Sequence, residues 1–184
     1  MKIFVETDRI ILREVVEDDA AAFFEMDSDP AVHTYLGSIP IETVDQALAS
    51  TKFIRQQYID FGIGRWAIVD KQTNTFVGWG GLKFRQDLVN GHANFYDVGY
   101  RLLRKHWGMG YATESARASI GYAFDKLKLD AVYALANVDN TASVNALLKS
   151  GLKITAELTF EEIPCYWFEI ARTQYDKQRC IMRR

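Results

Sequence analysis

The chain has 184 residues, of which 48% are hydrophobic, and this is enough for one core, so we expect a single domain over residues 1–184. The formal net charge of −2 lacks the basic excess of nucleic-acid-binding domains, so no nucleic-acid partner is expected. Because the sequence contains no apolar run of about 18 residues and no signal-peptide core at its N-terminus, we expect a cytoplasmic protein without a membrane contact. Its two cysteines, Cys165 and Cys180, form no CxxC pair and are predicted to be free thiols.

The first half of the chain predicts strands and helices in alternation. Residues 5–14 are predicted as one strand, and residues 16–26, with acids at their start, as a helix. A capping-box pattern at Thr43 and Gln46 begins a second helix, which Gly62 ends. The remaining strands of this half are predicted at residues 65–70, 75–84 and 94–103, the first two as a hairpin.

The second half continues this alternation. From Tyr111 the apolar residues keep helical spacing as far as Leu127, and a shorter helix is predicted over residues 140–150. Further strands are predicted at residues 131–138, 152–160 and 165–175, and the basic residues 177–184 as a solvated end. The order β-α-α-β-β-β-α-β-α-β-β predicts an α/β (α+β) fold with a mixed, mostly antiparallel sheet of about seven strands flanked by helices.

The segment HWGMGYATES, residues 106–115, lies between a predicted strand and a predicted helix. Gly108 and Gly110 let the backbone approach a ligand without an intervening Cβ. The first N–H groups of a helix have no partners inside it, so they are free to bind an anion. Positive charge is added nearby by Arg101, Arg104, Lys105 and His106. These features predict a pyrophosphate site.

Three phosphate motifs compete for this segment. No Walker P-loop pattern is present, and the dinucleotide pattern G-x-G-x-x-G/A has Thr113 in its third position. Asp130 follows at the distance expected of a ribose-binding acid, but it precedes the next predicted strand instead of ending it. A nicotinamide enzyme is therefore a weaker alternative, and an acetyl-coenzyme A site is the third candidate.

The segments DVGYRLLRKHWGMGYATES and NVDNTASVNALLKSGLK resemble the GNAT superfamily of N-acetyltransferases. More narrowly, they resemble the RimJ/RimL-type branch, named for enzymes that acetylate the N-termini of ribosomal proteins. The superfamily's pyrophosphate motif falls on Trp107, Gly108, Met109, Gly110, Tyr111 and Ala112, with Trp107 in place of the usual Arg or Gln. The resemblance implies the GNAT fold, acetyl-CoA as co-substrate, and transfer of an acetyl group to a primary amine.

The resemblance also implies roles for particular residues. The backbone around Tyr100, Arg101 and Leu102 would bind the pantetheine arm, Asn140 would contact the same arm, and Ser143 would reach the leaving thiolate. The attacking amine must lose a proton, so the reaction needs a base. Asp97 stands where the branch has a glutamate, and it is the predicted base, acting directly or through a water. From the residues alone, Asp97 also fits a salt-bridged strand acid, and Asn140 fits a helix N-cap. Gly99 indicates a bulge or a close approach.

The identity of the acceptor is left open by the sequence, between a small amine and a protein N-terminus. Seven acids and no Lys or Arg lie between Glu14 and Asp29, which favours a cationic acceptor, although a solvated helix face explains the same charges. The three histidines lack ligand spacing, so no metal is expected. A homodimer and a different class of function, an acetyl-CoA-binding sensor without turnover, are compatible with the same sequence.

Overall fold

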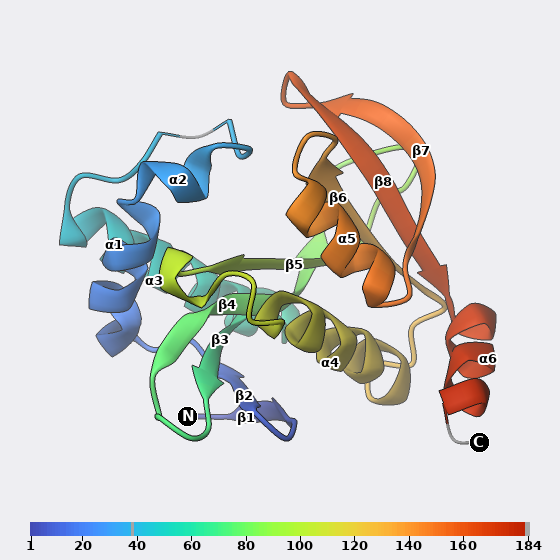
Figure 1. Ribbon diagram of the computed structural model, residues 1–184, viewed down its shortest axis with the longest axis horizontal. Coiled ribbons are helices and arrows are strands. Elements are labelled where there is room, and N and C mark those ends of the chain that lie inside the picture. The colour runs from blue at the N-terminus through green and yellow to red at the C-terminus, as the bar shows by residue number, and fades with distance from the viewer. Residues whose placement is uncertain (38, 183–184) are drawn as a thin grey trace.

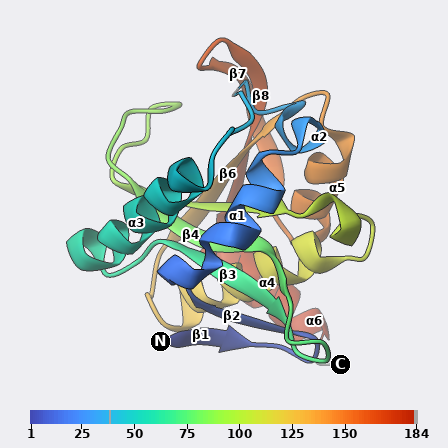
Figure 2. The same ribbon diagram turned by 90° about the vertical axis from the view of Figure 1, so that its left-hand side faces the viewer.

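One twisted sheet of eight strands runs through the molecule, and helices cover both of its faces (Figures 1 and 2). The computed structural model describes residues 1–37 and 39–182. The strand order is β1-β2-β3-β4-β5-β6-β8-β7. The strands are β1 (Ile3–Glu6), β2 (Ile10–Glu14), β3 (Arg65–Asp70), β4 (Phe76–Arg85), β5 (Phe95–Leu102), β6 (Ala131–Asn137), β7 (Lys153–Phe160) and β8 (Ile163–Ala171). The α-helices are α1 (Ala20–Asp27), α2 (Pro30–His33), α3 (Val44–Phe61), α4 (Tyr111–Asp125), α5 (Thr141–Lys149) and α6 (Arg172–Met182).

The sheet has one strand more than predicted, because residues 5–14 form a hairpin and not one strand. The chain reverses between β1 and β2, where the Thr7 N–H donates to the Ile10 carbonyl at 2.9 Å. The Thr7 hydroxyl also accepts from the Ile10 N–H at 3.0 Å. Polar residues in the middle of the segment therefore make a turn, and β1 pairs antiparallel with β2.

Two apolar clusters cover the opposite faces of the sheet. On one face α4 packs through residues such as Ala116, Ile120 and Phe124 against the central strands. On the other face α1 and α3 form a second cluster that includes Phe23 and Ile54 (Figure 2). Alternate residues of each central strand therefore point toward α4 or toward α1 and α3.

Strands β5 and β6 diverge in the middle of the sheet. They run parallel, and their register consists of the pair Asp97 and Tyr133. On its other side β5 is paired with β4 along its whole length, from Phe95 to Leu102. Beyond Asp97, the β6-facing edge of β5 therefore pairs with no strand of the described residues, and this divergence positions the site described below.

The C-terminal segment differs from its prediction. The strand predicted over residues 165–175 is β8, which ends at Ala171, and the chain then turns into α6. Arg172 fixes this change of direction, because its side chain donates to the carbonyls of Phe124 and Leu129 at 3.1 and 2.7 Å. The last two residues of the predicted solvated end lie outside the described residues. The sequence analysis also missed the short helix α2, for which Asp29 is the N-cap.

Other features of the described chain bear on earlier expectations. Cys165 and Cys180 are free thiols, as predicted. Among the helices in the described ranges, none combines the length and the apolar character that a membrane crossing requires. The capping box that begins α3 is confirmed: the Thr43 hydroxyl accepts from the Gln46 N–H, and the Gln46 side chain accepts from the Thr43 N–H at 3.0 Å.

The cap of α3 gives a testable prediction. Thr43→Ala removes the side-chain acceptor at the helix start, so the free energy of unfolding in urea should fall by about 1 kcal/mol. Thr43→Ser keeps the acceptor, so its free energy of unfolding should fall much less. Equal losses in the two variants would show that the cap does not stabilise α3.

Candidate active site

The glycine turn follows β5 and leads into α4. A short 3-10 turn, Arg104–His106, precedes it, and Gly110 is the N-cap residue of α4. Gly108 and Gly110 have φ values of 73° and 85°, in the left-handed region that favours glycine. A Cβ placed on Gly108 would meet nothing within 4 Å, so this part of the turn faces open space.

The start of α4 offers unpaired hydrogen-bond donors. The Glu114 N–H donates to the Gly110 carbonyl at 3.0 Å and closes the first turn of the helix. The N–H groups of Tyr111, Ala112 and Thr113 have no acceptor within the described ranges, and Gly110 has no side chain to cap them. These N–H groups lie at the positive end of the helix dipole, where unpaired donors have the geometry to bind an anion.

The hairpin between β1 and β2 holds this turn in place. Arg9 donates to the carbonyl of Met109 at 3.1 Å and to the carboxylate of Glu114 at 2.7 Å, and its guanidinium lies over the Tyr111 ring at 4.9 Å. The Thr7 hydroxyl donates to the other oxygen of Glu114. Glu114 therefore serves as an anchor for the turn. Sequence reasoning missed this clamp, whose one visible signal was the polar Thr7-Asp8-Arg9 run inside a predicted strand.

A second anchor comes from the end of β3. The Tyr111 hydroxyl donates to Asp70 Oδ2 at 2.7 Å. This hydrogen bond, together with those from Thr73, lowers the pKa of Asp70 to about 2. The same contact raises the pKa of Tyr111. Asp70 thus fixes the first residue of α4.

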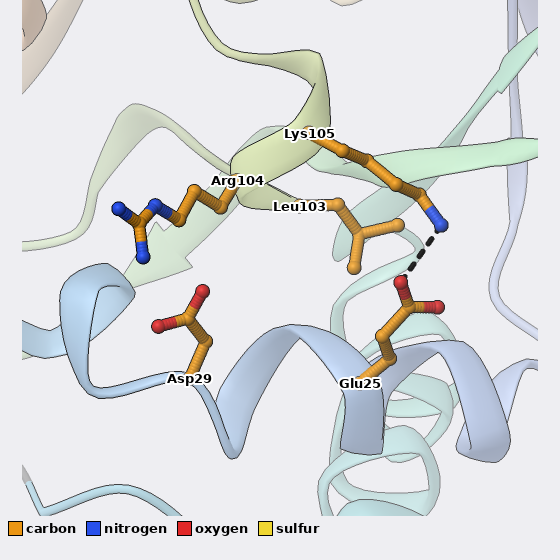
Figure 3. A pocket seen from close by; sticks show the side chains of 5 residues that line it. All are labelled: Glu25, Asp29, Leu103, Arg104 and Lys105. Atoms are coloured by element: carbon orange, nitrogen blue, oxygen red, sulfur yellow. Dashed lines mark hydrogen bonds and ion pairs between the residues drawn. The ribbon is translucent and has the colours of Figure 1, made fainter.

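Two of the four basic residues near the turn, Arg101 and Lys105, form ion pairs with carboxylates of α1. Lys105 pairs with Glu25 at 2.7 Å, across a pocket of about 490 Å³ that Leu103, Arg104 and Asp29 also line (Figure 3). Desolvation, followed by the Lys105 charge, lowers the pKa of His106, so it adds little positive charge at neutral pH.

Two further residues singled out near the turn have mainly structural contacts. Arg101 pairs with Asp27 of α1 at 2.8 Å, on the face of the sheet away from α4. The indole of Trp107 donates to the Leu102 carbonyl at 2.9 Å, while 46% of the residue is exposed. Trp107 thus ties the turn to the end of β5.

Asp97 forms a buried ion pair at the point where β5 and β6 diverge. Arg65 Nη2 lies 2.6 Å from Asp97 Oδ2, and Arg65 Nη1 donates to the carbonyls of Asp97 and Gly81. Desolvation lowers the pKa of Arg65, and the charge of Asp97 opposes that shift. Asp97 Oδ1 accepts no hydrogen bond from the part of the chain that the structure describes.

Gly99 gives the guanidinium its space. A Cβ on Gly99 would lie 2.6 Å from Arg65 Nη2. The close approach predicted at this glycine is therefore made by Arg65. Trp79 lies beside the pair, with the guanidinium groups of Arg65 and Arg101 at 5.5 and 5.3 Å from its ring.

The helix start after β6 brings Tyr100, Asn140 and Ser143 together. Asn140 Oδ1 accepts from the Ser143 N–H at 3.0 Å, so Asn140 is an N-cap of α5. The Tyr100 hydroxyl reaches across from β5 to donate to the Ser143 carbonyl at 3.0 Å, and it lies 3.1 Å from Ser143 Oγ. Burial raises the pKa of Tyr100 to about 12, although the Ser143 contact opposes this. Sequence reasoning assigned Tyr100 a backbone role and missed its hydroxyl.

The acidic stretch between Glu14 and Asp29 is largely neutralised. Most of its carboxylates have cationic partners from outside the stretch: Asp19 pairs with Arg13 at 2.7 Å, Glu25 with Lys105, Asp27 with Arg101, and Glu17 lies 4.0 Å from Lys52. Within the described ranges, no cluster of three or more His, Cys, Asp or Glu side chains is arranged to hold a metal ion.

The candidate residues thus follow one strand. Tyr100, Arg101 and Leu102 lie where β5 has no β6 partner, the glycine turn lies just beyond the end of β5, and Asp97 lies at the opposite end. Leu102 lies five positions after Asp97, which is about 17 Å along the strand. A splayed parallel strand pair that ends at an open helix start defines the class of acetyltransferases built on the GNAT fold.

The chain belongs to the GNAT acetyltransferases, because the sequence profile of the acetyltransferase (GNAT) domain matches residues 9–153. The uncharacterized N-acetyltransferase YoaA of Bacillus subtilis (strain 168) is 32% identical over 149 residues, which are 81% of this chain and 82% of YoaA. The chain is therefore an N-acetyltransferase.

Solved structures share the fold. A GNAT-family acetyltransferase from Bacillus anthracis superposes with a TM-score of 0.75 at 21% identity, covering 93% of this chain and 98% of the other. Spermidine N-acetyltransferase from Vibrio cholerae, in complex with CoA and spermine, gives a TM-score of 0.73 at 16% identity and covers 92% and 99%. At these identities the likeness concerns the fold alone.

The Tyr111 anchor predicts a pH dependence of stability. A carboxyl whose pKa is lower in the folded than in the unfolded protein stabilises the fold above the unfolded value, here 3.8, and this stabilisation disappears as the pH falls through the folded value, about 2. Tyr111→Phe removes the largest cause of the shift. The free energy of unfolding of this variant should lie furthest below that of the native chain at pH 6, and the difference should shrink between about pH 4 and pH 2.

Tyr122→Phe is the matched control, because the Tyr122 hydroxyl makes no hydrogen bond in the described part of the chain. Its effect on urea unfolding should not depend on pH over this range. A loss for Tyr111→Phe that is constant from pH 6 to pH 2 would contradict the assigned role of Asp70.

Proposed function

We propose that this chain transfers the acetyl group of acetyl-CoA to a primary amine by direct attack of the amine on the thioester. The divergence of β5 and β6 between Asp97 and the open start of α4 carries this proposal. Family membership supports it. The spermidine N-acetyltransferase that shares the fold, solved with CoA, adds support for an amine acceptor.

In this proposal the residues from Trp107 to Ala112 bind the pyrophosphate, with the N–H groups at the start of α4 as donors. The unpaired backbone edge of Tyr100, Arg101 and Leu102 hydrogen-bonds the pantetheine arm in the manner of a neighbouring strand. Asn140, at the start of α5, contacts the same arm from the other side. The free N–H groups of α4 and the open space over Gly108 fit such an occupant.

Asp97 takes the proton that the amine loses as its nitrogen bonds to the acetyl carbon. Arg65 occupies Oδ2, so Oδ1 is the oxygen left for this proton, directly or through a water. An α-amine titrates near pH 8 and is partly neutral at the start, whereas a lysine amine titrates near 10.4 and needs more help. The arrangement therefore suits an α-amine.

Ser143 donates its hydroxyl proton toward the sulfur as the carbon–sulfur bond breaks, and a proton from solvent restores the hydroxyl. The Tyr100 hydroxyl donates its proton to the Ser143 carbonyl, and its oxygen lies 3.1 Å from Ser143 Oγ, where it accepts from the Ser143 hydroxyl until that hydroxyl turns toward the thiolate. Tyr100 is therefore a positioning residue for this step. Its raised pKa keeps it protonated, and so a donor, across the working pH range.

We further propose that the protein belongs to the RimJ/RimL-type branch and works in the cytoplasm. The W-G-x-G-Y-A form of the glycine turn and the Ser143 position support the RimJ/RimL-type branch, with a small amine or a protein N-terminus as acceptor. The free thiols Cys165 and Cys180 support a reducing, cytoplasmic setting.

Binding of acetyl-CoA is tested by substitution in the glycine turn. Acetyl-CoA should raise the melting temperature of the native chain, and NADH and ATP should not. Gly108→Asn keeps the left-handed backbone, which Asn tolerates, but fills the open space over the turn, so we expect acetyl-CoA affinity to fall at least about tenfold.

Gly62→Asn is the matched control, because Gly62 has a φ of 69° and equally open surroundings at the end of α3, far along the chain from the turn. It should bind acetyl-CoA as the native chain does. An unchanged Kd in Gly108→Asn, measured by calorimetry, would refute the pyrophosphate assignment.

The proton-transfer roles are tested by kinetics at several pH values. Asp97→Asn keeps an oxygen for Arg65 but removes the proton acceptor, so kcat should fall by about 100-fold, and the loss should shrink as rising pH deprotonates the amine unaided. Ser143→Ala should lower kcat with little change in acetyl-CoA affinity. Tyr100→Phe should have a smaller effect in the same direction.

The cap of α5 separates catalysis from stability. Asn140 caps the helix through the backbone N–H of Ser143, so Ser143→Ala leaves the cap intact and should unfold as the native chain does. Asn140→Ala should lose about 1 kcal/mol of stability. Native rates for Asp97→Asn and Ser143→Ala at every pH would overturn both roles.

A further inference from the structure

Lys83 is a half-buried cation on the face of the sheet away from α4, and no carboxylate of the described residues forms an ion pair with it. It lies on β4 directly opposite Asp97 in the β4–β5 register. Paired residues of neighbouring antiparallel strands share a face, with Cβ atoms about 5 Å apart, so Lys83 and Asp97 stand side by side on the face away from α4. The Lys83 ammonium lies 5.9 Å from the ring of Phe53 on α3, and it makes no hydrogen bond or ion pair within the described ranges.

The other charges around Lys83 are already satisfied. Arg65 is paired with Asp97, and Arg85 is held by Asp87 at 3.0 Å and lies over the Phe160 ring at 4.8 Å. Against desolvation, the Asp87 hydrogen bond and the charges of Asp97, Asp87 and the exposed Glu161 raise the pKa of Arg85. Desolvation, followed by the charges of Arg65 and Arg85, lowers the pKa of Lys83.

What this arrangement lacks is an anion in direct contact with Lys83, because the charges of Asp97 and Asp87 oppose the lowering of its pKa but neither carboxylate forms an ion pair with it in the described chain. A partly buried charge without a counter-charge costs free energy, and a ligand carboxylate next to Lys83 would remove that cost on binding. The acids between Glu14 and Asp29, which would have favoured a polycation, are mostly engaged with Arg and Lys. The charge left unpaired beside Asp97 is therefore positive.

We propose that Lys83 binds a carboxylate of the acceptor, and that the acceptor is an amino acid or a close analogue, with its carboxylate next to the amine that is acetylated. This inference rests on the proposed function, in which Asp97 receives the proton of the amine. In an α-amino acid both groups branch from one carbon, which matches the adjacent positions of Asp97 and Lys83 on the sheet. A polyamine has no group for Lys83 and would be repelled by it.

The test compares three acceptors with the same side chain: an α-amino acid, its carboxamide and its decarboxylated amine. With the native chain, kcat/KM from CoA release should be at least about tenfold higher for the amino acid, as expected for a hydrogen bond between charged groups. Lys83→Met should bring the three values close together by raising KM for the amino acid, with kcat nearly unchanged. Lys83→Arg keeps the charge and should retain most of the preference.

Lys52→Met, on the exposed side of α3, is the control and should behave as the native chain does. If the carboxamide matches the amino acid in the native chain, or Lys83→Met slows all three acceptors equally, the inference is wrong and the proposed function stands. If acetyl-CoA binds but no amine releases CoA, the proposed function fails, and the inference about its acceptor fails with it.

Discussion

The buried ion pair between Asp97 and Arg65 is the interaction on which the rest of the site depends. Arg65 comes from β3, its guanidinium binds the carbonyl of Gly81 on β4, and its partner lies on β5, so one side chain joins three strands where β6 departs. Removing one member of such a buried pair typically costs about 3–5 kcal/mol, because the other charge is left uncompensated. Gly99 belongs to the same arrangement, since no other residue leaves room for the guanidinium. The edge of β5 beyond Asp97 has no β6 partner among the described residues. The Asp97–Arg65 pair holds this part of β5 in position against β3 and β4.

The opposite end of the site is held by residues from remote parts of the sequence. Arg9 and Thr7 reach the glycine turn from the first hairpin, and Asp70 reaches Tyr111 from the end of β3. A helix start with unpaired N–H groups has no internal means of fixing its own direction. These external contacts supply that direction, so the N–H groups of α4 are oriented before any anion arrives, and less ordering is required on binding.

The features that the sequence predicted are local ones. The strand, turn and helix around Gly108 and Gly110, and the caps at Thr43 and Asn140, depend on residues within a few positions of one another, and short patterns reveal them. The extra hairpin and α6 were missed because tertiary contacts decide them, as Arg172 does for the end of β8. Charge partners were missed for the same reason: the acidic stretch appeared free, although its partners come from other strands and turns. The Tyr100 hydroxyl reaches Ser143 across 43 positions, a distance that no local pattern encodes.

The divergence of β5 and β6 leaves a stretch of strand edge inside the sheet, where backbone groups are normally paired. A pantetheine arm lying along it would complete the sheet as a missing strand would. If acetyl-CoA binds there as proposed, it would become part of the folded structure, and its supply would influence the lifetime of the protein. A ligand at a hundred times its Kd adds about 2.7 kcal/mol to the stability of the folded state. A cell depleted of acetyl-CoA would therefore hold this enzyme in its least durable form, more open to unfolding and proteolysis, so its abundance as well as its rate would follow the acetyl supply.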